Sequence, residues 1–254
     1  MLATLQMYDL PETRPATEAF WAGLAKALGQ SPVLDMPEDW TVAWRRPDLL
    51  FSQTCGYPFT HEFAGRLKLV ATPHYDAPGC EGPRYCSFIM AREQAALESF
   101  RGRVAAFNNR DSMSGMLALK LAFAPLAENG RFFSGAIETG GHMASLLALQ
   151  EGRADVAAID CVTIALARRY RPQALAGLVE VARTPQVPGL PFVTVAGDVE
   201  RLRDALGKVF ADPALAAARE ALLLRGYSIL ASEDYAVIPR LEAGMEAGGG
   251  LALW

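Results

Sequence analysis

The chain has 254 residues, of which 51% are hydrophobic and 20% charged, so it can bury a sizeable core and is not compositionally disordered. Its formal net charge is -4 and its 24 basic residues are scattered, which leaves no basic footprint for nucleic acid. The most apolar helical stretch, 113–126, contains Lys120 and Pro125 and is shorter than the roughly 20 residues that cross a bilayer. These properties indicate a globular protein with neither a nucleic-acid partner nor a membrane span.

The cysteine spacing matches neither a CxxC metal pair nor a dense disulfide framework. We expect mostly buried, reduced thiols, with a Cys80–Cys86 bridge as the alternative in an oxidising compartment. The four positions are Cys55, Cys80, Cys86 and Cys161.

The N-terminus bears on the compartment. A secretory signal places a basic, then an apolar, then a small-residue segment before the fold, whereas Met1 is followed at once by a strand-like run. We therefore expect a periplasmic protein if a signal has been removed, and a cytoplasmic one otherwise.

The first part of the chain alternates between strands and helices. Apolar residues recur at helical spacing after Pro11, and the proline- and glycine-rich stretch 72–83 is expected to break regular structure and mark a crossover. The elements expected here are strands at 2–7, 48–52 and 67–71, a helix at 11–29 and a helix first turn at Pro58.

The middle of the chain alternates as a parallel sheet with helices on both faces requires. The expected strands are 85–90, 104–107, 132–137, 156–159 and 178–182, and the expected helices are 92–100, 112–124, 141–151 and 162–170. A second proline-rich crossover, RTPQVPGLP, follows the last of these strands.

The C-terminal part is predicted to be extended at 192–196 and helical afterwards, at 199–210, 214–224 and 235–245, with a poorly ordered tail AGGGLALW. The resulting prediction is an α/β fold of two hinged lobes with a ligand cleft. Lobe 1 is discontinuous, at 1–74 and 184–254, and lobe 2 is inserted at 75–183. Clefts of this kind are common ligand sites.

Three strand-to-helix loops carry the functional signal: QTCGYP at 53–58, NNRDSMSG at 108–115 and ETGGHMAS at 138–145. In parallel α/β sheets ligands lie outside the carboxyl ends of the strands, and the first turn of each following helix has unpaired N–H groups. Such loops favour an anion.

The second loop is the most informative. Asp111 or Ser112 can cap its helix, Ser112 and Ser114 add hydroxyl donors, and Gly115 lets a ligand approach the backbone closely. The alternative is that Asp111 and Ser112 only cap a helix. Three loops of the same character favour a ligand role.

Two further positions belong to the same hypothesis. His142 follows two glycines at a helix start and can donate a hydrogen bond, with charge if protonated, although the helix dipole disfavours its protonation. Asp160 ends the strand DVAAID, and a carboxylate beside an anion fits a ligand that carries a proton or an amine. Tyr8, Tyr57 and Tyr85, near strand ends, either donate O–H groups or pack in the core.

Catalytic patterns are missing from the sequence, which has no GxSxG, HExxH or Walker A segment and no GxGxxG after a strand. Cys55 and His61 invite a nucleophile–base interpretation, but residues six apart on a helix do not face each other. We therefore expect no catalytic residue.

The chain resembles the periplasmic substrate-binding components of phosphate, phosphite and phosphonate ABC transporters at NNRDSMSGMLAL, TGGHMASLLALQEGRADVAAID and TPQVPGLPFVTV. The resemblance extends over nearly the whole chain and implies a type II periplasmic-binding-protein fold. In that family a serine-rich helix start, a histidine after the glycine loop and an acidic strand end bind the phosphorus oxyanion. The matching positions are Ser112, Ser114, His142 and Asp160, with Tyr8, Tyr57 and Tyr85 matching less closely.

Two departures from the family accompany this resemblance. The chain starts directly at its first strand, where family members carry a signal and a longer N-terminal region. It also lacks a string of acidic residues that would hold an aminoalkyl group, so we expect a compact ligand.

Two alternatives use the same fold. An enzyme related to thiamine-pyrimidine synthases would need a cofactor lysine or a reactive cysteine, and none of the four lysines, Lys26, Lys68, Lys120 and Lys208, lies in the three loops. A cytosolic sensor would report the ligand to a partner protein.

We predict a solute-binding protein that closes around a small phosphorus oxyanion, acts as a monomer and feeds an ABC permease. No metal and no cofactor are expected. The expected ligand-binding residues are Tyr8, Thr54, Gly56, Tyr57, Tyr85, Ser112, Met113, Ser114, His142 and Asp160.

Overall fold

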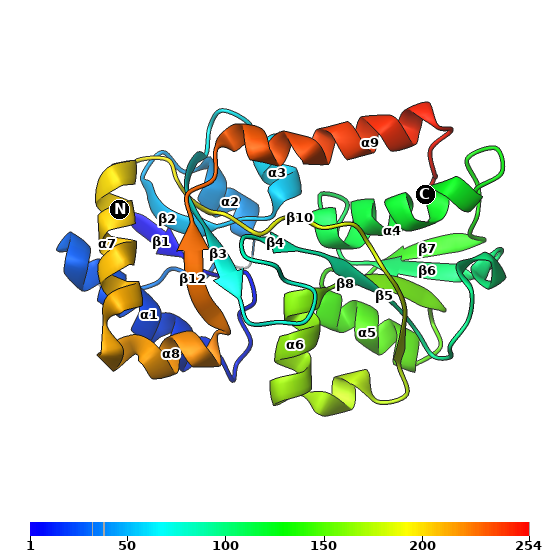
Figure 1. Cartoon of the computed structure of the whole chain (residues 1–254), viewed down its shortest axis with the longest axis horizontal. Coiled ribbons are helices and arrows are strands. Elements are labelled where there is room, and N and C mark those ends of the chain that lie inside the picture. Colours follow the sequence, from blue (N-terminus) through cyan, green and yellow to red (C-terminus); the bar gives the residue numbers. More distant parts are fainter. Residues whose placement is uncertain (32, 38, 254) are drawn as a thin grey trace. The chain divides into compact units, whose positions relative to one another are not determined.

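The computed structural model describes residues 1–31, 33–37 and 39–253, and it divides into two compact units (Figure 1). Unit 1 comprises Met1–Asp76, Glu81–Pro83 and Pro188–Asp234. Unit 2 comprises Ala77–Cys80, Arg84–Val187 and Tyr235–Trp254.

Unit 1 is built around a mixed sheet with the strand order β1-β2-β11-β3-β12. Strands β1 and β2 are parallel, β11 runs antiparallel to β2 and β3, and β12 runs antiparallel to β3. Its elements are β1 (Leu2–Thr4), α1 (Arg14–Leu28), α2 (Trp40–Arg45), β2 (Leu49–Gln53), α3 (Gly56–Thr60), β3 (Lys68–Tyr75), β11 (Phe192–Thr194), α7 (Val199–Ala211), α8 (Ala216–Ala221) and β12 (Leu224–Ser228).

The core of unit 1 follows from the helical periodicity of α1. Phe20, Trp21 and Leu24 recur on one face and are at most 1% exposed. The ring of Phe20 stacks on Phe192 of β11, and the ring of Trp21 stacks on Phe51 of β2. The helix α1 ends at Gly29, whose backbone is left-handed at φ 64°. Glycine occupies this position because residues with a side chain rarely adopt that conformation.

The strand β12 was not predicted, since its residues fall partly in an expected helix at 214–224. Leu223, at φ 58°, interrupts the helical backbone, and β12 then pairs with residues 72–75 of β3. The predicted break at 72–83 is therefore wrong at its start. Pro73 is tolerated in β3 because β11 pairs only with the earlier part of that strand, so Pro73 needs one hydrogen-bonded side.

Unit 2 is built around a second sheet with the order β7-β6-β8-β5-β9, in which β6 is parallel to β7 and β8. Figure 1 draws α4 on one side of this sheet and α5 on the other. Its elements are β4 (Arg84–Tyr85), β5 (Ser87–Ala91), β6 (Val104–Phe107), a π-helical turn (Met113–Leu117), α4 (Ala118–Phe123), β7 (Gly135–Glu138), α5 (His142–Gln150), β8 (Val156–Asp160), α6 (Cys161–Tyr170), β9 (Val179–Arg183) and α9 (Val237–Ala247). The short strand β10 (Val187–Pro188) spans the point at which the chain leaves unit 2.

Three predictions for unit 2 need correction. The sheet is not wholly parallel, because β5 runs antiparallel to β8 and β9. The helix expected at 92–100 is only a 3-10 turn, Leu97–Phe100. The strand expected at 132–137 begins at Gly135, because Phe132 and Phe133 pack their rings against Phe123.

The C-terminal residues also differ from the sequence assignment to lobe 1. The helix α9 is tied to unit 2 by an ion pair between Lys120 Nζ and Glu246 Oε1 at 2.8 Å. Beyond it, Ala252 N donates to Gly130 O at 2.9 Å. Leu251 and Leu253 are 2% and 6% exposed, so the described part of the tail is packed, and Trp254 lies outside the described residues.

Across the described ranges, no helix combines the length and the apolar run needed to span a bilayer. The His, Cys, Asp and Glu side chains described there form no group of three or more placed to hold a metal. Cys80 and Cys86 are thiols, so the bridge considered from the sequence is not formed.

Candidate functional site

The topology of unit 2 places three helix starts along one sheet edge. The strands β7, β6 and β8 are parallel neighbours, so their carboxyl ends lie side by side. The π-helical turn follows β6, α5 follows β7 and α6 follows β8. In such sheets this edge is where ligands bind, and each helix start has N–H groups without an intrahelical partner.

Ser112 caps the first of these helix starts. Its Oγ accepts a hydrogen bond from Gly115 N at 3.0 Å, and its carbonyl accepts from Leu117 N at 2.9 Å, which is the wider spacing of a π-helical turn. Met113 and Ser114 are buried in this turn. The capping interpretation of Ser112 is therefore confirmed, and the same hydroxyl retains a hydrogen that it can donate.

The structure gives a reason for the glycine at position 115 that was not expected from the sequence. A Cβ at this position would clash with the side-chain Oδ1 of Asn108, so the glycine makes room for Asn108. Asn108 is 9% exposed, and its Oδ1 is buried with no hydrogen-bond partner among the described residues. Asn108 was not among the predicted residues, although it is the first residue after a predicted strand.

His142 is the first residue of α5 and contacts the preceding loop. Its Nε2 lies 2.8 Å from Ser114 Oγ, which brings together two residues predicted from separate segments. Its Nδ1 is buried and has no hydrogen-bond partner among the described residues. Either tautomer leaves one hydrogen, on Nδ1 or on the Ser114 hydroxyl, to donate elsewhere.

Burial controls the charge of His142. Desolvation lowers the pKa of its imidazole to about 4, although part of the residue's surface stays exposed. The ring is neutral near pH 7, so the charged donation considered from the sequence requires a much lower pH. A neutral His142 can take part in hydrogen bonds but adds no positive charge to this sheet edge.

Asp160 is 1% exposed and ends β8 at the same edge. Its Oδ1 accepts from Val162 N at 2.7 Å and from Thr163 N at 3.1 Å, so the carboxylate caps α6. Tyr85, which ends β4, is 2% exposed. Both residues are thus fixed within the protein before any ligand is considered.

The predicted residues of unit 1 share an edge of their own sheet. Tyr8 follows β1, and Thr54, Gly56 and Tyr57 follow β2, which is parallel to β1. Tyr8 has a left-handed backbone, φ 62°, which costs a non-glycine residue of the order of 1 kcal/mol. Its ring meets Tyr75 edge-on at 5.1 Å.

The loop after β2 is held firmly. Thr54 is fully buried and its N–H donates to Pro191 O at 3.1 Å. The ring of Tyr57 stacks on His61 at 3.9 Å, and His61 Nδ1 lies 2.9 Å from Tyr57 O. The rings of Tyr57, in the first turn of α3, and His61, at its C-terminal end, therefore form a small aromatic platform.

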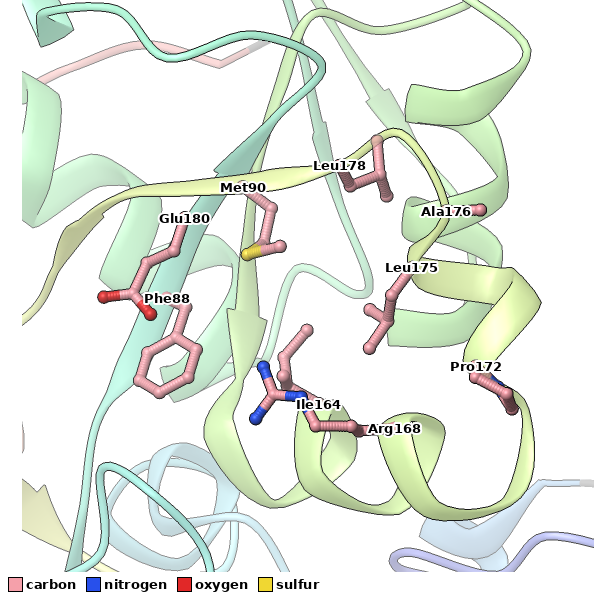
Figure 2. A pocket seen from close by; sticks show the side chains of 9 residues that line it. All are labelled: Phe88, Met90, Ile164, Arg168, Pro172, Leu175, Ala176, Leu178 and Glu180. Atoms are coloured by element: carbon pink, nitrogen blue, oxygen red, sulfur yellow. The ribbon is translucent and has the colours of Figure 1, made fainter.

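A pocket of about 240 Å³ elsewhere in unit 2 is lined by none of the predicted residues. Figure 2 shows the side chain of Arg168 reaching towards Phe88 and Ile164 inside it. Its lining residues are Phe88, Met90, Ile164, Arg168, Pro172, Leu175, Ala176, Leu178 and Glu180.

The two α/β units define the class of protein, the periplasmic-binding-protein fold. PhnD1 from Prochlorococcus marinus, solved with methylphosphonate, is 14% identical with a TM-score of 0.78, over 97% of this chain and 98% of that one. A binding protein component of an ABC phosphonate transporter from Pseudomonas aeruginosa is 12% identical with a TM-score of 0.76, over 98% and 87%. A Xanthomonas citri protein bound to ATP is 18% identical with a TM-score of 0.70, over 97% of each chain. At these identities the likeness concerns the fold.

The sequence itself identifies the family. Residues 7–235 match the family described as the periplasmic substrate-binding protein of the phosphonate ABC transporter. The chain therefore belongs to the phosphonate-binding family of ABC transporter substrate-binding proteins. No curated protein matches the chain significantly.

Family membership decides between the classes of function that the sequence left open. Members are substrate-binding components of transporters and not enzymes, so the enzymatic alternative is wrong. The family also implies a small ligand and a permease partner.

Proposed function

We propose that this chain captures a small phosphorus oxyanion, namely phosphate, phosphite or a phosphonate with a compact substituent, and delivers it to an ABC permease. The observation that carries the proposal is the 2.8 Å contact between Ser114 Oγ and His142 Nε2, which joins two helix starts at one sheet edge. A structural relative was solved with methylphosphonate, which supports the same ligand class.

The proposed recognition uses neutral donors. The backbone N–H groups of the π-helical turn and of the first turn of α5 form the positive ends of the peptide dipoles, and these ends would point towards a bound anion. The hydroxyl of Ser112 adds a side-chain donor, and the hydrogen-bonded pair of Ser114 and the neutral His142 adds one more, from His142 Nδ1 or from the Ser114 hydroxyl according to the tautomer. Because none of these groups is charged, the ligand's own charge and protonation state determine selectivity.

Asp160 is proposed to supply that selectivity. One of its oxygens accepts two backbone hydrogen bonds, and the carboxylate can accept a further one from a protonated ligand oxygen. Phosphate and phosphonate monoanions carry such a proton near neutrality, whereas sulfate does not. A carboxylate at this position would therefore repel sulfate and accept HPO₄²⁻ or H₂PO₄⁻.

An Asp160→Asn variant tests this role. Asparagine keeps an oxygen that can cap α6, so the fold should persist while the repulsion of sulfate disappears. Calorimetry should show sulfate binding to the variant and not to the wild type, with phosphate affinity reduced. Continued exclusion of sulfate by a folded variant would remove Asp160 from the recognition scheme.

Closure is proposed to complete the site. The chain passes between the units near residues 76–84, 187–188 and 234–235, and these segments would act as hinges. A ligand that binds the closed form better shifts the population towards it, bringing Tyr8 and the loop from Thr54 to Tyr57 onto the ligand.

The proposal is tested by a calorimetric and thermal-shift screen of phosphate, phosphite, methylphosphonate, 2-aminoethylphosphonate, sulfate and ATP. At 100 times its dissociation constant a ligand should stabilise the fold by about 2.7 kcal/mol. We expect a compact phosphorus oxyanion to bind, and 2-aminoethylphosphonate to bind more weakly than methylphosphonate. Binding of ATP alone would overturn the ligand class.

The chain offers a matched control for the site. His74 Nε2 contacts Ser228 Oγ at 2.8 Å in unit 1, which is the same kind of histidine–serine pair as that of His142. His142→Ala should weaken binding by about 2 kcal/mol, or roughly thirtyfold, while His74→Ala should leave it within twofold. Equal losses in both variants would indicate a general effect on folding.

A further inference from the structure

A tight turn at the crossing into unit 2 places a cysteine against the start of α6. Cys80 N donates to Ala77 O at 3.0 Å, and Pro78 and Gly79, at φ 95°, occupy the central positions of the turn. These are the residues that a type II turn favours. The turn brings Cys80 Sγ to 3.5 Å from Cys161 Sγ, although the two residues are 81 positions apart in the sequence.

Gly79 holds this turn close to the sulfur atoms. A Cβ at Gly79 would lie 3.0 Å from Cys161 Cβ and 3.0 Å from Cys86 Sγ, which is closer than side chains normally approach. A glycine is therefore required for two reasons: the turn needs a positive φ at this position, and a side chain would be too close to the two cysteines. The position of Cys80 follows from this packing.

The three cysteines differ in access. Cys161 is fully buried and Cys86 is 4% exposed, whereas Cys80 keeps part of its surface exposed. Cys161 Sγ contacts Cys80 Sγ at 3.5 Å, and Cys86 and Cys161 both lie against Gly79. An external reagent reaches Cys80 first, and Cys161 is the thiol in contact with it.

We propose that Cys80 and Cys161 form a reversible dithiol–disulfide pair, in which Cys80 reacts first and Cys161 resolves. The site takes disulfide reagents, meaning a small-molecule disulfide or the disulfide of an oxidoreductase. Cys86 packs beside the pair and does not join it.

The exchange balances in two steps. The Cys80 thiolate attacks one sulfur of the external disulfide, forming a mixed disulfide and releasing one thiolate. The Cys161 thiolate then attacks Cys80 Sγ, forming the Cys80–Cys161 bond and expelling the second external thiolate. Two protein thiols are oxidised, one external disulfide is reduced, and the two protein protons pass to the released thiolates or to solvent.

The geometry and the thiol chemistry indicate a slow, compartment-dependent pair. A disulfide needs an S–S distance of about 2.05 Å, so the two sulfurs must approach by roughly 1.5 Å, which the exposed turn can supply more easily than the buried start of α6. The hydrogen bond with Cys80 and burial raise the pKa of the Cys161 thiol, which slows the resolving step. The pair would stay reduced in a cytosol and oxidise in a periplasm.

Trypsin separates the candidates cleanly, because Arg84 lies between Cys80 and Cys86. Cleavage after Lys and Arg leaves Cys80 in peptide 69–84, Cys86 in 85–92 and Cys161 in 154–168, with Cys55 in 46–66. The native full-length protein would be treated with oxidised glutathione at about pH 8.5, near the ordinary thiol pKa. Remaining thiols would then be alkylated before digestion.

We expect the number of thiols to fall from four to two, with peptide 69–84 joined to 154–168. Cys86→Ser should give the same linkage, and Cys80→Ser should abolish it. Oxidation should raise the melting temperature of the wild type and leave that of Cys80→Ser unchanged, because the bond closes a long loop within unit 2.

Two results would overturn the pair. One is linkage of 69–84 to 85–92, which would restore the Cys80–Cys86 bridge. The other is retention of all four thiols in the native protein while the urea-unfolded protein loses them under the same oxidant. The wild-type peptide map decides the matter even if a cysteine variant fails to fold.

Discussion

The two units present different chemistry at the carboxyl ends of their parallel strands. Unit 2 offers three helix starts, two serine hydroxyls and a neutral histidine, whereas unit 1 offers tyrosine rings and a threonine after β1 and β2. Hydroxyl and N–H donors suit an oxyanion, and aromatic rings suit the exclusion of water and the contact with an organic substituent. Under the proposed function, the donor groups of unit 2 would supply most of the recognition of an oxyanion.

The largest expected effect that sharpens this comparison is that of pH on stability through His142. Its folded pKa of about 4 lies below the ordinary value of 6.5, so between these values the unfolded chain binds more protons. The contribution of the neutral His142 ring to the free energy of unfolding is therefore complete above about pH 6.5 and is lost as the pH falls towards 4. The loss is at most about 3 kcal/mol.

Urea unfolding of the wild type and of His142→Gln at pH 7 and near pH 4.5 measures this loss. Burial also lowers the pKa of His74 in unit 1, so His74→Gln serves as the matched variant. The acid-induced loss should shrink more in His142→Gln than in His74→Gln. A larger effect at His74 would reverse the comparison.

A smaller effect is expected at Gly141, which precedes His142. Its φ of -177° is an extended backbone that any residue adopts, and a Cβ there meets no atom of the described residues within 4 Å. Gly141→Ala should leave stability unchanged or raise it by about 0.5 kcal/mol. If the ligand occupies that space, affinity should fall about tenfold, or about 1.4 kcal/mol.

Gly140→Ala is the control for this change. Its φ of 83° is left-handed, so alanine should destabilise the fold by about 1 kcal/mol through backbone strain. Thermal melts with and without phosphate distinguish the two variants. Unchanged ligand affinity in Gly141→Ala would move the ligand away from the start of α5.

The smallest effect is expected for the tyrosines of unit 1. Tyr57→Phe keeps the ring that stacks on His61 and removes only the hydroxyl. If unit 2 supplies most of the recognition, affinity should fall by about 0.5 kcal/mol, or roughly twofold. A loss as large as that of His142→Ala, measured by the same calorimetry, would make the two units equal partners in recognition.

Several elements were predictable because their signals are local. The helix expected at 141–151 is α5 at His142–Gln150, and the strand expected at 156–159 is β8 at Val156–Asp160. Both follow from apolar periodicity bounded by glycine or acidic residues. The contact between Ser114 and His142 was consistent with the same reasoning, since parallel neighbouring strands bring their following loops together.

The sequence by itself determined the alternation of strands and helices, the loops with donor groups and the family, because each depends on neighbouring residues. Tertiary structure decided what depends on distant partners. Examples are the pairing of β12 with β3 and the antiparallel direction of β5 relative to β8. Others are the ion pair that joins α9 to α4 in unit 2 and the contact of Cys80 with Cys161. Tertiary structure also kept His142 neutral, because the pKa of an imidazole follows its burial, and burial is a property of the packed fold.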